Sequence, residues 1–375
     1  MKQHIYADNA ATTKLDKVAF EVMTPWLLEE YGNVSQPYAF ARNPKKALAD
    51  ARVIIAECIG AAPEEIYFTS GGTESDNWVI KSSAFSAPEK RATITSAFEH
   101  HAILRSCAAI ERLGYPVAYM LPSNEGYITP EILEKYITDN TRLVSVIFAN
   151  NEIGSIQPVQ ELCEVAHSHG AMFHTDAVQA VGHIKINVHE LGVDFLSASA
   201  HKFNGPKGIG FLYIRKGVEL PPYADGGAQE DAHRAGTENV AGIVGMAAAL
   251  KGNCDLLERN QQYILDLEKL LLLQLDKAGI AYKRNGGDRK LPGLLSLSFL
   301  GKNGDAILHR MDLIGISIST GSACDSVNTE ISHVLKAIQL DEDYATGTIR
   351  ISLGKNNTEE DVKAIAASLI KIVAL

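Results

Sequence analysis

Short β-rich runs alternate with longer helical patterns through the middle of the chain, and this alternation constrains the fold most strongly. The clearest predicted strands cover residues 66–69, 143–148, 172–175 and 195–199. Helical patterns follow two of them, starting at Glu74 and Pro158. Strands separated by helices in this way pair in parallel, with the helices as crossover connections. We therefore predict an α/β fold for the middle of the chain.

A second region follows a Leu-rich helical run over residues 256–275. Beyond this run we expect strands at residues 294–299, 316–320 and 348–353, and a helix near residues 305–311. A terminal helix opens with Thr358-Glu359-Glu360-Asp361, which is close to a capping box. Because a chain of 375 residues can hold two domains, we predict that a smaller α+β domain closes the chain.

Composition and charge exclude several classes of protein. With 46% hydrophobic and 21% charged residues, the chain is globular. Its net charge is -10 at pH 7 and it has no long run of Lys or Arg, so we expect no direct nucleic-acid binding. The longest apolar stretch, residues 240–250, is too short to span a membrane. The five cysteines include no C-x-x-C pair, so we predict no disulfide framework and no zinc site, and place the protein in the cytoplasm.

Common cofactor motifs are absent from the sequence. It contains no G-x-x-x-x-G-K-[ST] phosphate loop and no H-E-x-x-H helix. A strand-like run follows the Gly-rich residues 205–210, whereas a dinucleotide-binding motif would open a helix there. Since His100 and His101 would point apart on a helix or a strand, we predict no metal site.

Two glycines and several hydroxyl groups lie between the first predicted strand and its helix, in Ser70-Gly71-Gly72-Thr73-Glu74-Ser75. Backbone amides at a helix N-terminus can bind a phosphate. A tight turn with a Ser or Thr cap explains the segment about equally well.

Asp176 and Lys202 each follow a predicted strand, at the sheet edge where α/β proteins bind ligands. An aspartate on a pyridine nitrogen and a lysine that forms a Schiff base are the protein groups that pyridoxal phosphate (PLP) requires. Either residue alone is more often a surface charge or a helix cap. Together with the phosphate-binding segment, they favour PLP.

The chain resembles the NifS/IscS-type cysteine desulfurases, which belong to the fold-type I, class V aminotransferase group of PLP enzymes. The matching segments are residues 6–13, 68–77, 99–100, 150–154, 176–179, 199–202, 234–239, 322–324 and 349–354. The resemblance implies a large PLP-binding domain over residues 15–258, with a mainly parallel sheet flanked by helices. It also implies a small α+β domain formed by residues 1–14 and 259–375.

The resemblance further implies roles for individual residues. Lys202 would form the Schiff base, Asp176 would hold the pyridine nitrogen, and His100 would stack on the ring. Thr237 would reach the phosphate of the neighbouring subunit's PLP, so the enzyme would be a homodimer. The remaining implied cofactor contacts are Gly72, Thr73, Asn151, Gln179, Ser199 and His201.

Arg350 and Asn33 are candidates for substrate binding, together with Asn151. Arg350 interrupts the apolar alternation of residues 349–353, which suits a surface salt bridge or a fork around a substrate carboxylate. The pattern by itself favours the salt bridge, whereas the resemblance implies the carboxylate. The resemblance also implies that Asn33 contacts the same region.

Cys324 lies in a run of small and polar residues, which indicates an exposed loop. The other four cysteines lie in helical, mostly apolar settings and are expected to be buried. Cys324 matches the cysteine that carries a persulfide in the family. The loop departs from the family pattern at residues 325–331, and the Asp325 carboxylate is expected to raise the pKa of the neighbouring thiol.

These features predict a cysteine desulfurase that converts L-cysteine to L-alanine. The amine of Lys202 would remove the Cα proton, Cys324 would take the sulfur, and His100 would exchange protons near the ring. As the resemblance implies, a second protein would collect the sulfur for iron-sulfur cluster assembly or tRNA thiolation. Three alternatives stay open: a selenocysteine lyase with the same residues, an aminotransferase that does not need Cys324, and a weakly catalytic scaffold for sulfur delivery.

Overall fold

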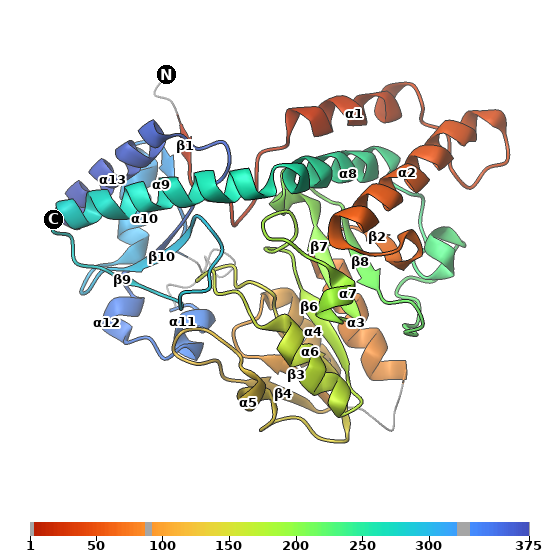
Figure 1. Cartoon of the computed structure of the whole chain (residues 1–375), viewed down its shortest axis with the longest axis horizontal. Helices are drawn as coiled ribbons and strands as arrows, with labels where there is room; N and C mark the ends of the chain where they lie inside the picture. The colour runs from red at the N-terminus through yellow and green to blue at the C-terminus, as the bar shows by residue number, and fades with distance from the viewer. Residues whose placement is uncertain (1–3, 87–91, 321–330, 375) are drawn as a thin grey trace.

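A seven-stranded sheet forms the centre of the larger part of the molecule (Figure 1). The computed structural model describes residues 4–86, 92–320 and 331–374. The strand order is β2-β8-β7-β6-β5-β3-β4, and β8 runs antiparallel to both of its neighbours while the other pairs are parallel. The strands are β2 (Ile66–Thr69), β3 (Ala92–Ser96), β4 (Val117–Met120), β5 (Thr141–Ser145), β6 (Met172–Asp176), β7 (Phe195–Ser199) and β8 (Gly210–Ile214).

Three of the four predicted strands are confirmed to within one residue of their bounds, as β2, β6 and β7. The strand predicted at residues 143–148 begins and ends earlier, as β5. Backbone hydrogen bonds from Val146 N to His174 O (3.1 Å) and from Phe148 N to Asp176 O (2.8 Å) still hold its continuation beside β6. Residues 146–148 are apolar because they stay buried beside β6, although they lie beyond the regular strand β5.

Helices cover both faces of this sheet, as the alternation along its strands shows. Phe195 packs with residues of α3 and α4, whereas the next residue, Leu196, belongs to a separate core with residues of α2, α6 and α8. A strand buried on both faces reads as a continuous apolar run, which matches the predicted α/β pattern. The helices of this part are α1 (Lys17–Leu28), α2 (Arg42–Ile59), α3 (Gly72–Ser86), α4 (His101–Glu111), α5 (Pro130–Leu133), α6 (Val159–Ser168), α7 (Val188–Leu191) and α8 (Val240–Asp255), with short 3-10 helices η1 (Ala39–Ala41), η2 (Pro63–Glu65), η3 (Ala200–Lys202) and η4 (Gln229–Ala232).

The second region contains an antiparallel sheet in the order β12-β10-β9 and a two-stranded pair, β1 with β11. Its own hydrophobic core joins α9, α10 and α13 to these strands. Residue Ala7 from the start of the chain belongs to that core. The elements are β1 (Ile5–Tyr6), α9 (Leu257–Lys277), β9 (Lys283–Arg284), β10 (Leu294–Ser298), α10 (Gly304–Leu313), β11 (Ile316–Ser317), α11 (His333–Ala337), α12 (Glu342–Ala345), β12 (Thr348–Ser352) and α13 (Glu359–Val373).

The predicted ends of these elements are partly corrected. The expected strand at residues 316–320 is regular only at β11, after which Ser319 makes an isolated bridge to Arg350. The capping box of α13 is confirmed, since Thr358 and Asp361 bond to each other's backbone N–H groups. The separate core supports the predicted division into two domains, whose boundaries remain a prediction.

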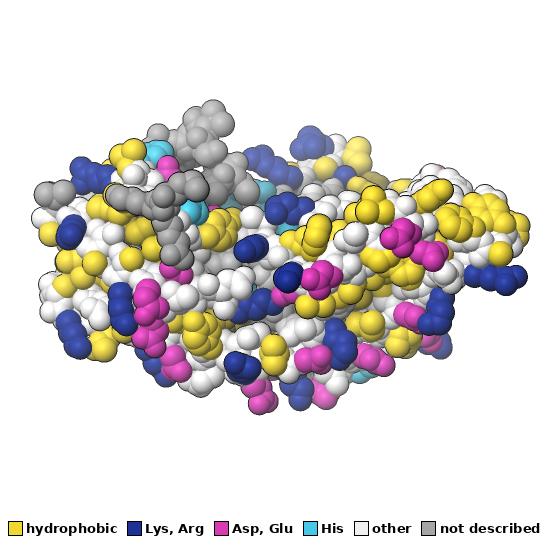
Figure 2. Space-filling view, turned by 90° about the horizontal axis from the view of Figure 1, so that it is seen from above, with side chains coloured by type: hydrophobic (Ala, Val, Ile, Leu, Met, Phe, Trp, Pro, Cys, Tyr) yellow, Lys and Arg dark blue, Asp and Glu magenta, His cyan; other side chains and the backbone are white. Residues whose placement is uncertain are grey.

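Hydrophobic side chains gather on the surface over α1 and the segment that joins it to α2 (Figure 2). We call this surface the α1 patch; its exposed members are Val18, Phe20, Leu27, Leu28, Tyr31, Tyr38 and Phe40. A contiguous group of exposed apolar side chains often marks a site of interaction with another molecule.

Among the described residues, no single helix is long and apolar enough to cross a membrane. Only α8 and α9 taken together meet that criterion, by length and composition, and they are bent by 72° where they join.

Candidate active site

A cavity lies at the carboxyl ends of β6 and β7, beside the first turn of α3. Arg350 of β12, which belongs to the second region, also lines the cavity. Among the predicted site residues that the structure describes, all except Asn33 and Thr237 line this cavity. Its lining residues are Ala10, Ala11, Gly72, Thr73, Asp76, His100, Ile147, Asn151, Asp176, Val178, Gln179, Ser199, His201, Lys202 and Arg350.

Lys202 follows β7 at the end of the 3-10 helix η3. Its ammonium donates hydrogen bonds to the carbonyl oxygens of Ala10 (2.5 Å) and Ala11 (3.0 Å). The ring of His183 hydrogen-bonds the Lys202 carbonyl oxygen at 2.9 Å and so holds the backbone. The start of the chain thus supplies the acceptors that orient the amine in the cavity.

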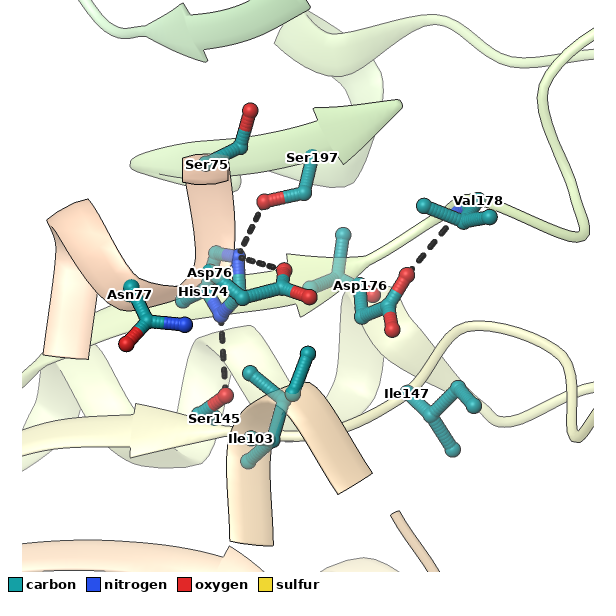
Figure 3. Close-up of polar contacts among 12 residues, drawn as sticks. Ser75, Asp76, Asn77, Ile103, Ser145, Ile147, His174, Asp176, Val178 and Ser197 are labelled. Atoms are coloured by element: carbon teal, nitrogen blue, oxygen red, sulfur yellow. Dashed lines mark hydrogen bonds and ion pairs between the residues drawn. The ribbon is translucent and has the colours of Figure 1, made fainter. Parts of the chain in front are cut away.

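Asp176 ends β6 and is 3% exposed. Its Oδ1 accepts a hydrogen bond from the Val178 N–H at 3.0 Å (Figure 3). Burial raises the pKa of Asp176 to about 6, although the Val178 N–H and the charge of Lys202 oppose the rise. At neutral pH the side chain is therefore mostly a carboxylate, which can accept a hydrogen bond from a protonated ring nitrogen.

His100 caps the N-terminus of α4. Its Nδ1 accepts a hydrogen bond from the Ala102 N–H at 3.1 Å, which leaves the proton of a neutral ring on Nε2. Burial, followed by the nearby charges of Lys202, His101 and His333, lowers the pKa of His100 to about 4. The ring is therefore neutral at pH 7, and its role in proton exchange stays a prediction.

The Gly-rich segment forms the other end of the site. Helix α3 begins at Gly72, and N–H groups in the first turn of a helix have no acceptor within it. A side chain has no room here, because a Cβ on Gly72 would lie 2.4 Å from Val178 Cγ2. The hollow beside this turn is lined by Thr73, Ser199, His201 and Lys207, whose donors suit an anion.

The two ends together fit PLP. A buried carboxylate and an amine face one part of the cavity, while a helix N-terminus with hydroxyl groups and a lysine lines the adjoining hollow. A pyridine ring that carries an aldehyde and a phosphate requires this set of donors and acceptors. The geometry of the segment 70–75 therefore suits a phosphate-binding site.

Arg350 is 3% exposed and pairs with Asp8, so the salt bridge that the pattern favours is present but is buried and not at the surface. Its guanidinium donates to Asp8 Oδ1 (2.8 Å) and to the Asn151 carbonyl oxygen (2.9 Å). Its Nε has no hydrogen-bond partner among the described residues. Because buried donors are normally satisfied, this unused N–H in the cavity wall is suited to a substrate carboxylate.

Two of the described site residues, Asn33 and Thr237, are not brought to this cavity. Asn33 lies between α1 and α2, where its Oδ1 accepts a hydrogen bond from the Ser35 N–H at 2.9 Å. Thr237 is exposed and lines a different hollow, with Ser70 and Arg234. Cys324 and Asp325 lie outside the described residues, as does most of the atypical segment 325–331.

The sequence reasoning missed several functional neighbours. The carbonyl groups of residues 10 and 11, the Asp8 partner of Arg350, Lys207 and Asp76 all contribute to the site. Asp76 follows Gly72 by four residues and so lies on the same face of α3. That spacing is the one signal in the sequence that could have found it.

The four described cysteines lie apart from the cavity. Cys107 and Cys163 are buried as predicted, while Cys58 and Cys254 are half-buried. In the part of the chain that the structure describes, no group of three or more His, Cys, Asp or Glu side chains could hold a metal ion.

Sequence comparison matches residues 5–365 to the family model described as aminotransferase class V. A protein from Dictyoglomus turgidum named "Cysteine desulfurase IscS" is 45% identical over 375 residues, which is 100% of this chain and 95% of the relative. "Putative cysteine desulfurase IscS 1" from Bacillus subtilis is 41% identical over 99% of each chain.

Solved structures agree with these relatives. A "NifS-like protein" superposes with a TM-score of 0.93 at 36% identity, covering 99% of this chain and 100% of its own. A structure described as "SspA in complex with cysteine" gives a TM-score of 0.84 at 35% identity, covering 94% of this chain and 100% of its own. The predicted fold, a mainly parallel sheet flanked by helices, is confirmed.

Proposed function

This chain belongs to the class V aminotransferase family and is a cysteine desulfurase, and we propose that it removes sulfur from L-cysteine with Lys202, Asp176 and Cys324 as its central residues. The assignment of residues rests on one observation. A single cavity is lined by residues from four separate parts of the chain: Lys202, Asp176, His100 and Arg350. The family implies PLP, which fits the two ends of the site.

Asp176, Lys202 and the first turn of α3 would hold the cofactor. Asp176 would accept a hydrogen bond from the protonated pyridine nitrogen, and the segment 71–73 with Ser199 and His201 would hold the phosphate. When bound, PLP supplies an electron-withdrawing ring conjugated to the amino group of the substrate. The neutral ring of His100 would offer a flat surface and the Nε2–H donor beside it.

Arg350 would bind the carboxylate of cysteine, using its unused Nε and the donors that now bond Asp8 and Asn151. This contact would place the Cα–H bond within reach of the Lys202 amine. Lys202 would then act as the base that takes the Cα proton and the acid that returns a proton to the product.

The sulfur transfer balances without an added oxidant. The Cβ–S bond of cysteine breaks as an S–S bond forms to Cys324 Sγ, and Cβ gains a proton. L-Cysteine and the thiol of Cys324 thus become L-alanine and a Cys324 persulfide. A thiol or an acceptor protein then removes the outer sulfur. We propose an iron-sulfur cluster scaffold or a tRNA-thiolation enzyme as the acceptor.

We further propose that the protein is a homodimer in the cytoplasm. The α1 patch supplies exposed apolar surface for a second copy. Thr237 is exposed away from its own cavity, which suits a contact with the neighbouring subunit's PLP. The four described cysteines are free thiols, which suits a reducing compartment.

The test is to measure sulfide and alanine released from L-cysteine by the PLP-loaded protein under a reducing thiol. We expect equal amounts of the two products. Cys324→Ala should reduce both by at least about a thousandfold, since the residue that forms the persulfide is lost. Cys254→Ala, which removes a half-buried thiol outside the cavity, is the matched control and should retain turnover.

Two outcomes would contradict the proposal. Alanine production that persists in Cys324→Ala would assign sulfur release to a route without this thiol. Retained turnover in Lys202→Ala would remove the amine from the mechanism.

A further inference from the structure

A second carboxyl group lies beside Asp176 in the wall of the cavity. Asp76 on α3 is 1% exposed and lines the same cavity. Its Oδ1 has no hydrogen-bond partner among the described residues and lies 3.7 Å from Nε2 of His174, too far for a hydrogen bond. Figure 3 shows this carboxyl group between His174 and Asp176.

His174 does not supply a counter-charge. It lies on β6, two residues before Asp176, and is fully buried. The hydroxyl groups of Ser145 and Ser197 occupy its two ring nitrogens at 2.8 and 3.0 Å. Burial lowers the pKa of His174 to about 3. The imidazole is therefore neutral, and both of its nitrogens are already bonded to hydroxyls.

The other charges that act on Asp76 are carboxylates. Asp176 on β6 and Glu99, which precedes α4, both act to raise its pKa, and a hydrogen bond with Ser197 on β7 opposes them. Glu99 is itself fully buried, and burial raises its pKa to about 8. The cation Lys202 acts instead on Asp176.

Neighbouring carboxyl groups in a buried site cannot all ionise without a large electrostatic penalty. Asp176 has the Val178 N–H and the charge of Lys202 to stabilise a carboxylate. Among the described residues, Asp76 has one oxygen without a hydrogen-bond partner, and the side chain recorded near that oxygen is His174 and not a lysine or arginine. Burial, with Asp176 next in effect, raises the pKa of Asp76 well above its ordinary value. The proton therefore belongs on Asp76 and the negative charge on Asp176.

We propose that Asp76 is a positioning residue held in its protonated form, and that it thereby leaves Asp176 as the ionised partner of the ring nitrogen. The proposal rests on the proposed function, because it concerns the role of Asp176 toward PLP. With His174 and Ser197, the protonated Asp76 makes a neutral layer behind Asp176. An ionised Asp76 would raise the pKa of Asp176 and so weaken its hold on a protonated ring.

The first test uses the protein without cofactor and so does not depend on the proposed function. We would measure urea unfolding across pH for the wild type and for Asp76→Asn, which copies the shape of a protonated carboxyl. A raised pKa in the folded state means that stability is complete below the unfolded-state pKa and is lost as pH rises through the folded-state pKa.

The variant lacks this loss. The ratio of the variant's folding equilibrium constant to that of the wild type should therefore increase as pH rises above about 4. The increase should reach up to about tenfold per pH unit and should stop at the pH where Asp76 ionises in the folded wild type. A difference between the two proteins that stays constant with pH, or that favours the wild type as pH rises, would overturn the proposal.

The second test follows the visible absorbance of bound PLP across pH in the wild type, Asp76→Asn and Asp176→Asn. We expect Asp76→Asn to remove an alkaline component of the titration, and Asp176→Asn to shift the band throughout. If Asp76→Asn instead reproduces Asp176→Asn, Asp76 is an ionised partner of the ring and the proposal is wrong. If Asp176→Asn shifts neither the band nor PLP affinity, the proposed role of Asp176 fails, while the unfolding test still decides the protonation of Asp76.

Glu99→Gln is the matched control, because it removes a second buried carboxyl that does not line the cavity. It should change the pH dependence of unfolding and leave the visible band unchanged. The Glu99→Gln variant also provides a test if Asp76→Asn does not fold. With the Glu99 carboxyl removed, infrared spectra of the cofactor-free variant at neutral pH should still show the C=O band of a protonated carboxyl, which we assign to Asp76. A spectrum without this band would overturn the proposal.

Discussion

At the residue scale, burial in the cavity determines which side chains carry a charge at neutral pH. Burial raises the pKa of Asp176 to about 6 and lowers the pKa of His100 and of His201 to about 4. At neutral pH, the site therefore contains one mostly ionised aspartate and two neutral imidazoles.

This pattern predicts how PLP affinity depends on pH. Asp176 is ionised above about 6 and protonated below it, so PLP binding should weaken by about tenfold per pH unit as pH falls below that value. Titration of the cofactor-free protein with PLP at several pH values measures this. The phosphate of PLP titrates in the same range, so Asp176→Asn, which lacks the aspartate step, supplies the baseline. Identical profiles for the two proteins would contradict the assignment of Asp176.

Arg350→Lys tests the substrate contact. Lysine keeps the charge and loses the planar fork, and each charge-assisted hydrogen bond lost costs about 1.5–3 kcal/mol. The KM for L-cysteine should therefore rise about tenfold or more, with a smaller fall in kcat. Steady-state alanine release measures both. Arg284→Lys is the control, because Arg284 pairs with Glu268 outside the cavity; an equal effect on KM in both variants would remove Arg350 from substrate binding.

At the scale of elements, β6 and α3 place their side chains by simple periodicity. His174 and Asp176 are two residues apart on β6 and so share one face of the strand. Gly72 and Asp76 are four residues apart on α3 and share a face of that helix. The close approach of α3 to the segment after β6 brings the two pairs together, and Gly72 permits that approach.

Gly72→Ala tests this approach. The new Cβ would lie 2.4 Å from Val178 Cγ2, so Val178, whose N–H bonds Asp176, must move. PLP affinity should fall by about tenfold or more, since a misplaced site residue of this kind is costly. Gly252→Ala within α8 is the control: its Cβ would meet nothing within 4 Å, and it should leave PLP affinity unchanged and stabilise the helix by up to about 1 kcal/mol. Equal PLP affinity in the two variants would contradict the role of Gly72.

At the scale of the whole molecule, the α1 patch is the feature that a single chain leaves unexplained. Leu28 and Tyr31 are 71% and 72% exposed, and a second copy would cover them. Leu28→Glu should therefore shift the protein from a dimer toward a 40.6 kDa monomer in sedimentation experiments. Leu313→Glu places the same change at a residue that is 85% exposed in the second region and should leave the dimer intact. A wild-type protein that sediments as a monomer would exclude the homodimer.

The sequence by itself determined the α/β pattern, the strands β2, β6 and β7, the capped α13, and the positions of Asp176 and Lys202 at the sheet edge. These features depend on local periodicity and on the rule that parallel strands end at a common edge. Tertiary structure alone decided that Arg350 is buried against Asp8 and the Asn151 carbonyl, and that the carbonyls of Ala10 and Ala11 meet Lys202. It also decided the burial that raises the pKa of Asp76 and lowers the pKa of His174. Contacts between residues far apart in the chain set burial, and burial sets the charge of a titratable group, so no local pattern could reveal them.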